Sequence, residues 1–272
     1  MKRLSLRTSV WLWIVATFIT LVAAVYQRAT GPTYPVRGHI SVAGATVKFK
    51  LTRSGDAASD AVVSIPVLDR SFSGELVYKR YPSNDEWTTE VLQRVGDNLV
   101  GSIPKQPPAG KVTYRVNLIS GDGAKTALTP EPVVMRFKGT VPFYVLHPHI
   151  FFMFFSMLVG TRCGLEALFH GDRARRMAIE TAVMLFVGGI ILGPIVQKFA
   201  FGAFWTGWPI GHDLTDNKTA VALLFWLIAL WRDVKGKNGG RGWYMLAAVM
   251  QLVVYSIPHS MFGSQVDYTK TN

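Results

Sequence analysis

Long apolar runs, separated by basic residues, constrain this chain more than any other feature. They occupy residues 10–25, 143–168, 177–196, 219–231 and 243–257. A helix needs roughly 20 apolar residues to cross the hydrocarbon core of a bilayer, which is about 30 Å thick. Runs of this kind within 272 residues, 49% of them hydrophobic, predict a membrane protein built on an α-helical bundle.

The positions of the basic residues predict how the chain is threaded through the membrane. Lysine and arginine are concentrated in three places: Lys2, Arg3 and Arg7; Arg162, Arg173, Arg175 and Arg176; Arg232, Lys235, Lys237 and Arg241. By the positive-inside rule these segments are cytoplasmic. We therefore expect five transmembrane helices in a bacterial inner membrane, with the N-terminus cytoplasmic and the C-terminus external. The charge of +12 does not indicate nucleic acid, because the basic residues flank apolar runs and form no single patch.

The first apolar run, within residues 1–32, has two interpretations. Val22-Ala23-Ala24 would suit a signal-peptidase site, so the run could be a cleaved signal peptide. An uncleaved anchor helix is the favoured interpretation, because the run is long for a signal peptide and Trp11 and Trp13 suit a membrane interface. Both interpretations send the following segment out of the cytoplasm.

Residues 33–140 form a predicted extracytoplasmic β domain. Val47, Phe49 and Leu51 alternate with polar residues, as expected for a strand with one buried face. Turn signals recur between such segments and indicate about seven strands, which fits a β-sandwich. The segment PAGKVTYRV, residues 108–116, resembles the late strands of immunoglobulin-like and fibronectin-like domains. That resemblance implies an Ig-like fold and an interaction with other membrane or periplasmic proteins.

Within the four-helix region of residues 141–272, the external segment 199–218 combines Trp, Gly, His and Asp in an unusual way. The apolar run that follows it has only 13 residues, which rise about 20 Å as a helix. That helix must therefore take in polar residues from the loop. We expect these residues to lie at or below the membrane boundary, where polar groups usually face a partner or a ligand. They are Asp213, Asp216, Asn217 and Lys218.

Four of the six histidines share the external side in this topology and suggest a metal site. They are His147, His149, His212 and His259, with Asp213 and Asp216 nearby in the sequence. Imidazole binds copper, iron, zinc and haem iron, and carboxylates could complete a harder site. The alternative is a set of interfacial histidines hydrogen-bonded to backbone or water. We predict one polar pocket formed by His149, His212, Asp213 and His259, with His147 as a substitute for His149.

Two tryptophans, Trp205 and Trp208, have a similar pair of interpretations. They could belong to the aromatic belt of a membrane interface. The glycines and proline among them favour a re-entrant loop instead, covering a pocket. The order of external His, Trp-rich loop ending in Asp, and second external His resembles the haem-handling membrane proteins of cytochrome c maturation. That resemblance implies haem bound beneath Trp205 and Trp208, between His147 or His149 and His259.

Two functions from different classes follow. The first is metal or haem binding on the external face, in redox chemistry or cofactor handling. The second is a non-catalytic accessory or scaffold subunit of a larger membrane complex, with the Ig-like domain as its interaction module. The sequence contains no nucleophile elbow, phosphate loop, dinucleotide turn or His-Glu-x-x-His helix, so we do not expect an enzyme. A single cysteine, Cys163, excludes an internal disulfide.

Overall fold

The computed structural model describes residues 3–211, 213–236, 240–258, 263 and 265–270. The chain divides into two compact units. The helical unit comprises residues 1–32, 141–199 and 203–263, and the β unit comprises residues 33–140, 200–202 and 264–272.

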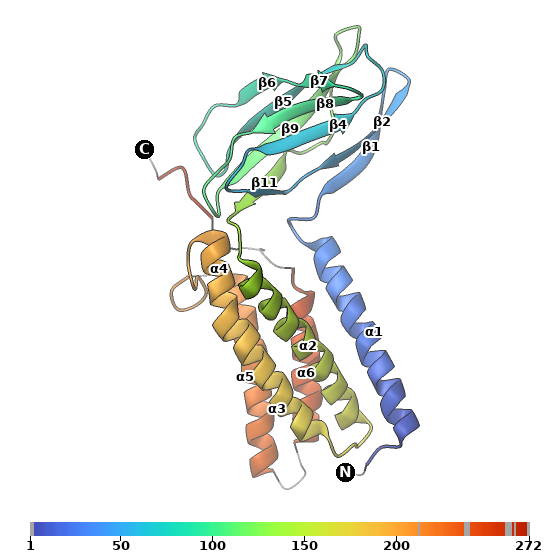
Figure 1. Ribbon diagram of the computed structural model, residues 1–272, viewed down its shortest axis with the longest axis vertical. Coiled ribbons are helices and arrows are strands. Elements are labelled where there is room, and N and C mark those ends of the chain that lie inside the picture. The colour runs from blue at the N-terminus through green and yellow to red at the C-terminus, as the bar shows by residue number, and fades with distance from the viewer. Residues whose placement is uncertain (1–2, 212, 237–239, 259–262, 264, 271–272) are drawn as a thin grey trace. The chain divides into compact units, whose positions relative to one another are not determined.

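The helical segments follow the predicted apolar runs closely (Figure 1). Their bounds are α1 Leu6–Thr30, α2 Phe143–Leu168, α3 Ala174–Leu185, the π-helix η1 Phe186–Leu192, α4 Gly193–Phe201, α5 Leu214–Lys235 and α6 Arg241–Ser256. Four spans are long and apolar enough to cross a membrane: α1, α2, the continuous segment Ala174–Phe201, and α5. These spans identify a membrane protein that carries a β domain. The predicted fifth span corresponds to α6, which has 16 residues.

Helix α5 begins five residues before the apolar run from which it was predicted. The Asp213 side chain caps it by accepting a 2.8 Å hydrogen bond from the Thr215 backbone N–H. The helix therefore has 22 residues instead of 13 and takes in Asp216, Asn217 and Lys218. This confirms that the short run extends into the polar loop.

A π-helical segment, η1, interrupts the span from α3 to α4. Pro194 is the second residue of α4, just after η1, and proline lacks the N–H needed for the regular helical bond to the carbonyl four residues earlier. Gly188 and Gly189 within η1 let neighbouring helices approach closely, since a Cβ on Gly189 would lie 2.4 Å from Thr219 Cγ2 of α5. The wider π turn also leaves the Gly188 carbonyl available to a side chain of α2.

Helices α2, α5 and α6 are joined by polar contacts inside the apolar bundle. Trp226 Nε1 donates to Gln251 Oε1 at 2.9 Å, and Gln251 Nε2 lies 3.5 Å from Ser156 Oγ. Helix α1 packs on α2 and α6, where Gln27 Nε2 donates to the Tyr255 carbonyl at 2.6 Å. Because lipid offers no hydrogen-bond partners, these contacts satisfy side chains that would be costly to leave unpaired in the membrane.

The β unit is built from mainly antiparallel strands around one apolar core. The strands are β1 Val36–Val42, β2 Ala45–Leu51, β3 Ser54–Asp56, β4 Ala61–Pro66, β5 Ser73–Arg80, β6 Thr88–Val91, β7 Gln93–Val95, β8 Asn98–Ile103, β9 Lys111–Ile119, β10 Lys125–Ala127 and β11 Val133–Lys138. A six-stranded sheet has the order β3-β11-β9-β5-β6, with β10 paired to β9. A three-stranded sheet has the order β4-β8-β7, and β1 pairs with β2.

The predicted alternation in the β unit is confirmed in β2, where Val47, Phe49 and Leu51 are buried and the lysines between them are exposed. Buried residues from all three sheets form a single core cluster. The strands within the described residues outnumber the seven expected, because β3, β7 and β10 have only three residues each and carry too little alternation to be recognised.

Candidate functional site

The loop between α4 and α5 is organised around the two predicted site carboxylates. Asp216 Oδ2 accepts hydrogen bonds from the backbone N–H groups of Thr206 at 2.8 Å and Gly207 at 3.1 Å. Thr206 Oγ1 lies 3.2 Å from Asp213 Oδ2, and the Asp213 N–H donates to the Thr206 carbonyl at 2.8 Å. Both carboxylates are buried. They therefore hold the loop against the start of α5.

Two further side chains tie the loop to its flanking helices. Gln197 Nε2 of α4 donates to Thr206 Oγ1 at 2.6 Å, and Asn217 Oδ1 of α5 accepts from the Trp208 N–H at 2.7 Å. Gly207 is required at the point of closest approach, because a Cβ there would lie 2.7 Å from both Asp216 Cβ and Asn217 Oδ1. The loop is therefore folded by side-chain to backbone bonds from both sides.

The two tryptophans of the loop differ in their surroundings. Trp205 is half-buried, and its Nε1 donates to the Trp208 carbonyl at 3.2 Å. Trp208 is 75% exposed and precedes a cis peptide bond to Pro209. Trp205 thus closes the loop on itself, while Trp208 leaves a large aromatic surface open to another molecule.

The two described histidines of the predicted pocket are both bonded to backbone carbonyls. His147 is exposed, with Nδ1 2.9 Å from the Phe143 carbonyl oxygen in its own helix. His149 is half-buried, with Nδ1 2.8 Å from the Gly188 carbonyl oxygen of η1. A carbonyl can only accept, so Nδ1 carries the hydrogen in each neutral ring and Nε2 keeps its lone pair.

The remaining predicted ligands, His212 and His259, lie outside the described residues. Within the part of the chain that the structure describes, no three His, Cys, Asp or Glu side chains are grouped so that they could hold a metal ion. The convergence of His149, His212, Asp213 and His259 therefore stays a prediction.

Lys218 is a buried cation near this loop, in the first turns of α5. Its Nζ donates to the Ile257 carbonyl at 2.5 Å, just past the end of α6. The carbonyls at a helix C-terminus have no partner within the helix, so a cation there is favourable. Lys218 accordingly joins the start of α5 to the end of α6.

The sequence analysis missed an ion pair inside α2. Arg162 Nη1 lies 2.7 Å from Glu166 Oε2, and both side chains are almost completely buried. The sequence analysis grouped Arg162 with the basic residues that follow the apolar run 143–168, whereas the structure places it inside that helix, against Ser9 and Trp13 of α1. The i, i+4 spacing of opposite charges within an apolar run was the signal that could have revealed the pair.

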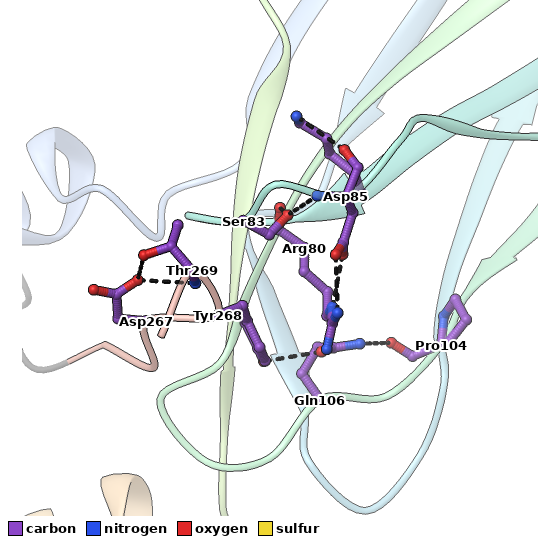
Figure 2. Close-up of polar contacts among 9 residues, drawn as sticks. Arg80, Ser83, Asp85, Pro104, Gln106, Asp267, Tyr268 and Thr269 are labelled. Carbon is purple, nitrogen blue, oxygen red and sulfur yellow. Dashed lines mark hydrogen bonds and ion pairs between the residues drawn. The ribbon is translucent and has the colours of Figure 1, made fainter. Parts of the chain in front are cut away.

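A second candidate site lies in the β unit, where the C-terminal tail, residues 265–270, packs against the β-sheet domain (Figure 2). Tyr268 Oη donates to Gln106 Oε1 at 2.9 Å, and the Tyr268 N–H donates to the Pro82 carbonyl at 3.1 Å. Lys111 Nζ donates to Gln265 Oε1 at 2.6 Å. The tail thus contacts the loop before β9 and the turn after β5.

Arg80 completes this tail-binding surface. Its guanidinium lies 4.8 Å from the centre of the Tyr268 ring and donates two hydrogen bonds to Asp85, at 2.7 and 2.9 Å (Figure 2). Those hydrogen bonds lower the pKa of the Asp85 carboxyl below its usual value. Gly110 is required beneath the ring, because a Cβ there would lie 2.5 Å from Tyr268 Oη. The surface is therefore shaped to receive an aromatic side chain carried on a turn of the chain.

Comparison of the chain with protein-family models and with curated proteins gives no match. The functional conclusion consequently depends on the geometry of the two units.

Proposed function

We propose that the protein is a membrane-anchored accessory subunit, which uses the open edge of its β domain to bind a partner protein. The main support is strand β6, the last strand of the six-stranded sheet. All four of its residues are exposed, and Val91 is 66% exposed. An exposed edge strand without proline or lysine is a template for pairing with another chain.

The hydrogen-bonding register shows which backbone groups β6 offers to a partner. Leu92 donates its N–H to the Gly74 carbonyl, and the register pairs Val91 with Glu75 and Thr89 with Val77. In an antiparallel pair, bonded residues alternate with residues whose backbone groups point the other way. The N–H groups of Thr89 and Val91 therefore point away from β5, toward the open edge.

The loop between α4 and α5 supports the same function. Its carboxylates accept bonds from the protein's own backbone, which is the arrangement expected of a structural loop. As part of this proposal, the β domain has an immunoglobulin-like fold. The single core that its sheets share supports that assignment.

The proposed topology has five spans, with the N-terminus cytoplasmic and the β domain and C-terminus outside a bacterial inner membrane. The tail after α6 packs on the β domain that precedes α2, so both lie on one side of the membrane. The chain must then cross an even number of times between them. Between the β domain and the tail, three helical segments are long and apolar enough to cross a membrane. Helix α6, with a rise of roughly 24 Å, is the fourth crossing.

Substitution of Thr89 tests the partner-binding edge. Thr89→Pro removes an outward N–H without removing a bond to β5, so the sheet should stay folded while a pairing partner is lost. Thr89→Ala keeps the N–H and serves as the matched control. Crosslinking of the full-length protein in its native membrane should give a defined adduct with wild type and Thr89→Ala, and none with Thr89→Pro. Equal adducts from both variants would exclude the β6 edge.

A second candidate function, metal or haem binding, is supported by one observation. The bond from His149 to the Gly188 carbonyl fixes the ring so that Nε2 is the nitrogen able to bind a metal. Metal-binding histidines commonly make such a bond with their other nitrogen. An absorbance spectrum and metal analysis of purified protein should then give a Soret band or stoichiometric metal, lost in His149→Ala and kept in the β1 control His39→Ala. If the wild-type protein is colourless and contains no metal, the metal or haem function is excluded and only the accessory function remains.

A further inference from the structure

We propose that the helical unit binds one anionic phospholipid, with its phosphate in a basic cavity between α1 and α2 and an acyl chain in an adjoining apolar groove. The basic cavity has a volume of about 240 Å³. It is lined by Arg3, Leu4, Leu6, Ser9, Glu166 and Arg173. These residues come from the segment before α1 and its first turn, the end of α2 and the turn that leads to α3.

The charges around this cavity favour an anion. Glu166 is its one acidic side chain, and both of its oxygens are already engaged. Oε2 pairs with the buried guanidinium of Arg162 at 2.7 Å, and Oε1 accepts from the Arg173 N–H at 3.3 Å. The positive charges of Arg3 and Arg173 therefore remain to bind a ligand. Guanidinium groups suit phosphate because they donate two parallel hydrogen bonds to it.

An apolar groove runs along the same pair of helices. It has a volume of about 300 Å³ and lies between α1, α2 and α6, with Ile19, Gly164, Leu168 and Val249 among its lining residues. Its α2 residues flank Glu166 in the last turns of that helix. Ile19 lies ten residues beyond Ser9 on α1, a rise of about 15 Å. The groove therefore extends from the level of the basic cavity toward the middle of the span, as a lipid chain does.

The groove is too small to enclose a helix, which favours an acyl chain as its occupant. A partner helix about 10 Å wide and 15 Å long would fill roughly 1,200 Å³, four times the space available. An acyl chain is much thinner. The only unpartnered polar atom among the lining side chains is Thr161 Oγ1, within the described residues. Basic pockets between membrane helices are a known form of anionic headgroup site, and the adjacent groove distinguishes a lipid from free phosphate.

The experiment titrates delipidated full-length protein in detergent with phosphatidylglycerol and with phosphatidylcholine of the same acyl chains, read out by native mass spectrometry. Wild type should prefer phosphatidylglycerol. In R3Q/R173Q that preference should fall roughly thirtyfold, at about 1 kcal/mol for each arginine. R175Q/R176Q is the matched control, because it removes two charges from exposed side chains of α3. Its preference should change by less than about twofold.

The preference is a ratio measured within each variant, so it remains informative if a variant is less stable. Glycerol 3-phosphate, which has no acyl chain, should bind far more weakly than phosphatidylglycerol. Ile19→Trp should fill the groove and weaken both lipids. The proposal is overturned if the two double variants lose the preference equally, if wild type shows no preference, or if glycerol 3-phosphate binds as well as the lipid.

Discussion

Asp216 is the residue on which the loop between α4 and α5 most depends. One of its oxygens accepts two backbone N–H groups, and hydrogen bonds to a charged acceptor contribute about 1.5–3 kcal/mol each. Gly207 is buried, so water cannot readily replace the lost partner of its N–H. Oδ2 of Asp216 could therefore bind a metal ion only by releasing both amides.

Replacement of Asp216 by Ala should loosen this loop without unfolding the helices. A local loss of about 3 kcal/mol, the lower bound for two such hydrogen bonds, corresponds to roughly 150-fold faster opening. Hydrogen exchange of residues 203–211 would measure it. Asp172→Ala, at an exposed position in the turn between α2 and α3, is the control. Unchanged exchange in Asp216→Ala would contradict the structural role of the carboxylate.

Tyr78 should give the β domain a distinct pH dependence. Burial, together with the 2.6 Å hydrogen bond to Glu90, raises its pKa from the usual 10 to about 12. A group whose pKa is higher in the folded than in the unfolded protein contributes to the free energy of unfolding. That contribution is fully present below the unfolded pKa and is lost as the pH rises from about 10 to 12. Tyr78→Phe should therefore lose less thermal stability than wild type between pH 9 and pH 11.5. Tyr81→Phe, at an exposed position, should behave like wild type, and an equal loss in all three proteins would refute the prediction.

At the scale of elements, close packing of α2 against α5 and α6 depends on Gly160. A Cβ at this position would lie 2.2 Å from Gln251 Oε1 and 3.0 Å from Trp226 Cζ2. Those two side chains are hydrogen-bonded to each other inside the bundle. Any added atom would therefore displace the polar contact as well as the helix.

Gly160→Ala should destabilise the bundle by about 1–3 kcal/mol, the usual cost of overpacking a core. Gly242→Ala is a matched control in α6, because nothing lies within 4 Å of its added Cβ. Thermal unfolding in detergent compares the two. A Gly160→Ala protein as stable as Gly242→Ala would show that the helices can move apart without cost.

At the scale of the whole molecule, the C-terminal tail constrains the topology more strongly than any single helix. It follows the last helix and yet packs on a domain that precedes helices α2 to α6. A tail on the opposite face of the membrane could not make those contacts.

A thiol crosslink tests this contact in the intact membrane. Lys111 and Gln265 touch through their side chains, so K111C/Q265C should be bridged rapidly by a short bifunctional reagent. The native Cys163 is buried and should not compete. K125C/Q265C is the control, because Lys125 pairs with Glu75 instead. Equal bridging of both pairs, or of neither, would count against the tail contact and the even number of crossings.

The sequence by itself determined the features that depend on local pattern. Apolar length predicted four segments that are long and apolar enough to cross a membrane, and alternation predicted strands such as β2. The shortness of residues 219–231 correctly predicted that α5 would take in polar loop residues, because the thickness of a bilayer fixes the length that a helix needs.

Only the tertiary structure decided which partners the polar residues found. Asp216 bonds to Thr206 and Gly207, Arg162 pairs with Glu166 against α1, and Tyr268 packs on the β domain. A buried polar side chain must have a hydrogen-bond partner, and the sequence indicates which polar residues are buried. The identity of the partner depends on which segments fold together. In the loop between α4 and α5, the sequence predicted that Asp216 binds a ligand, whereas the structure shows that the protein's own backbone N–H groups satisfy this carboxylate.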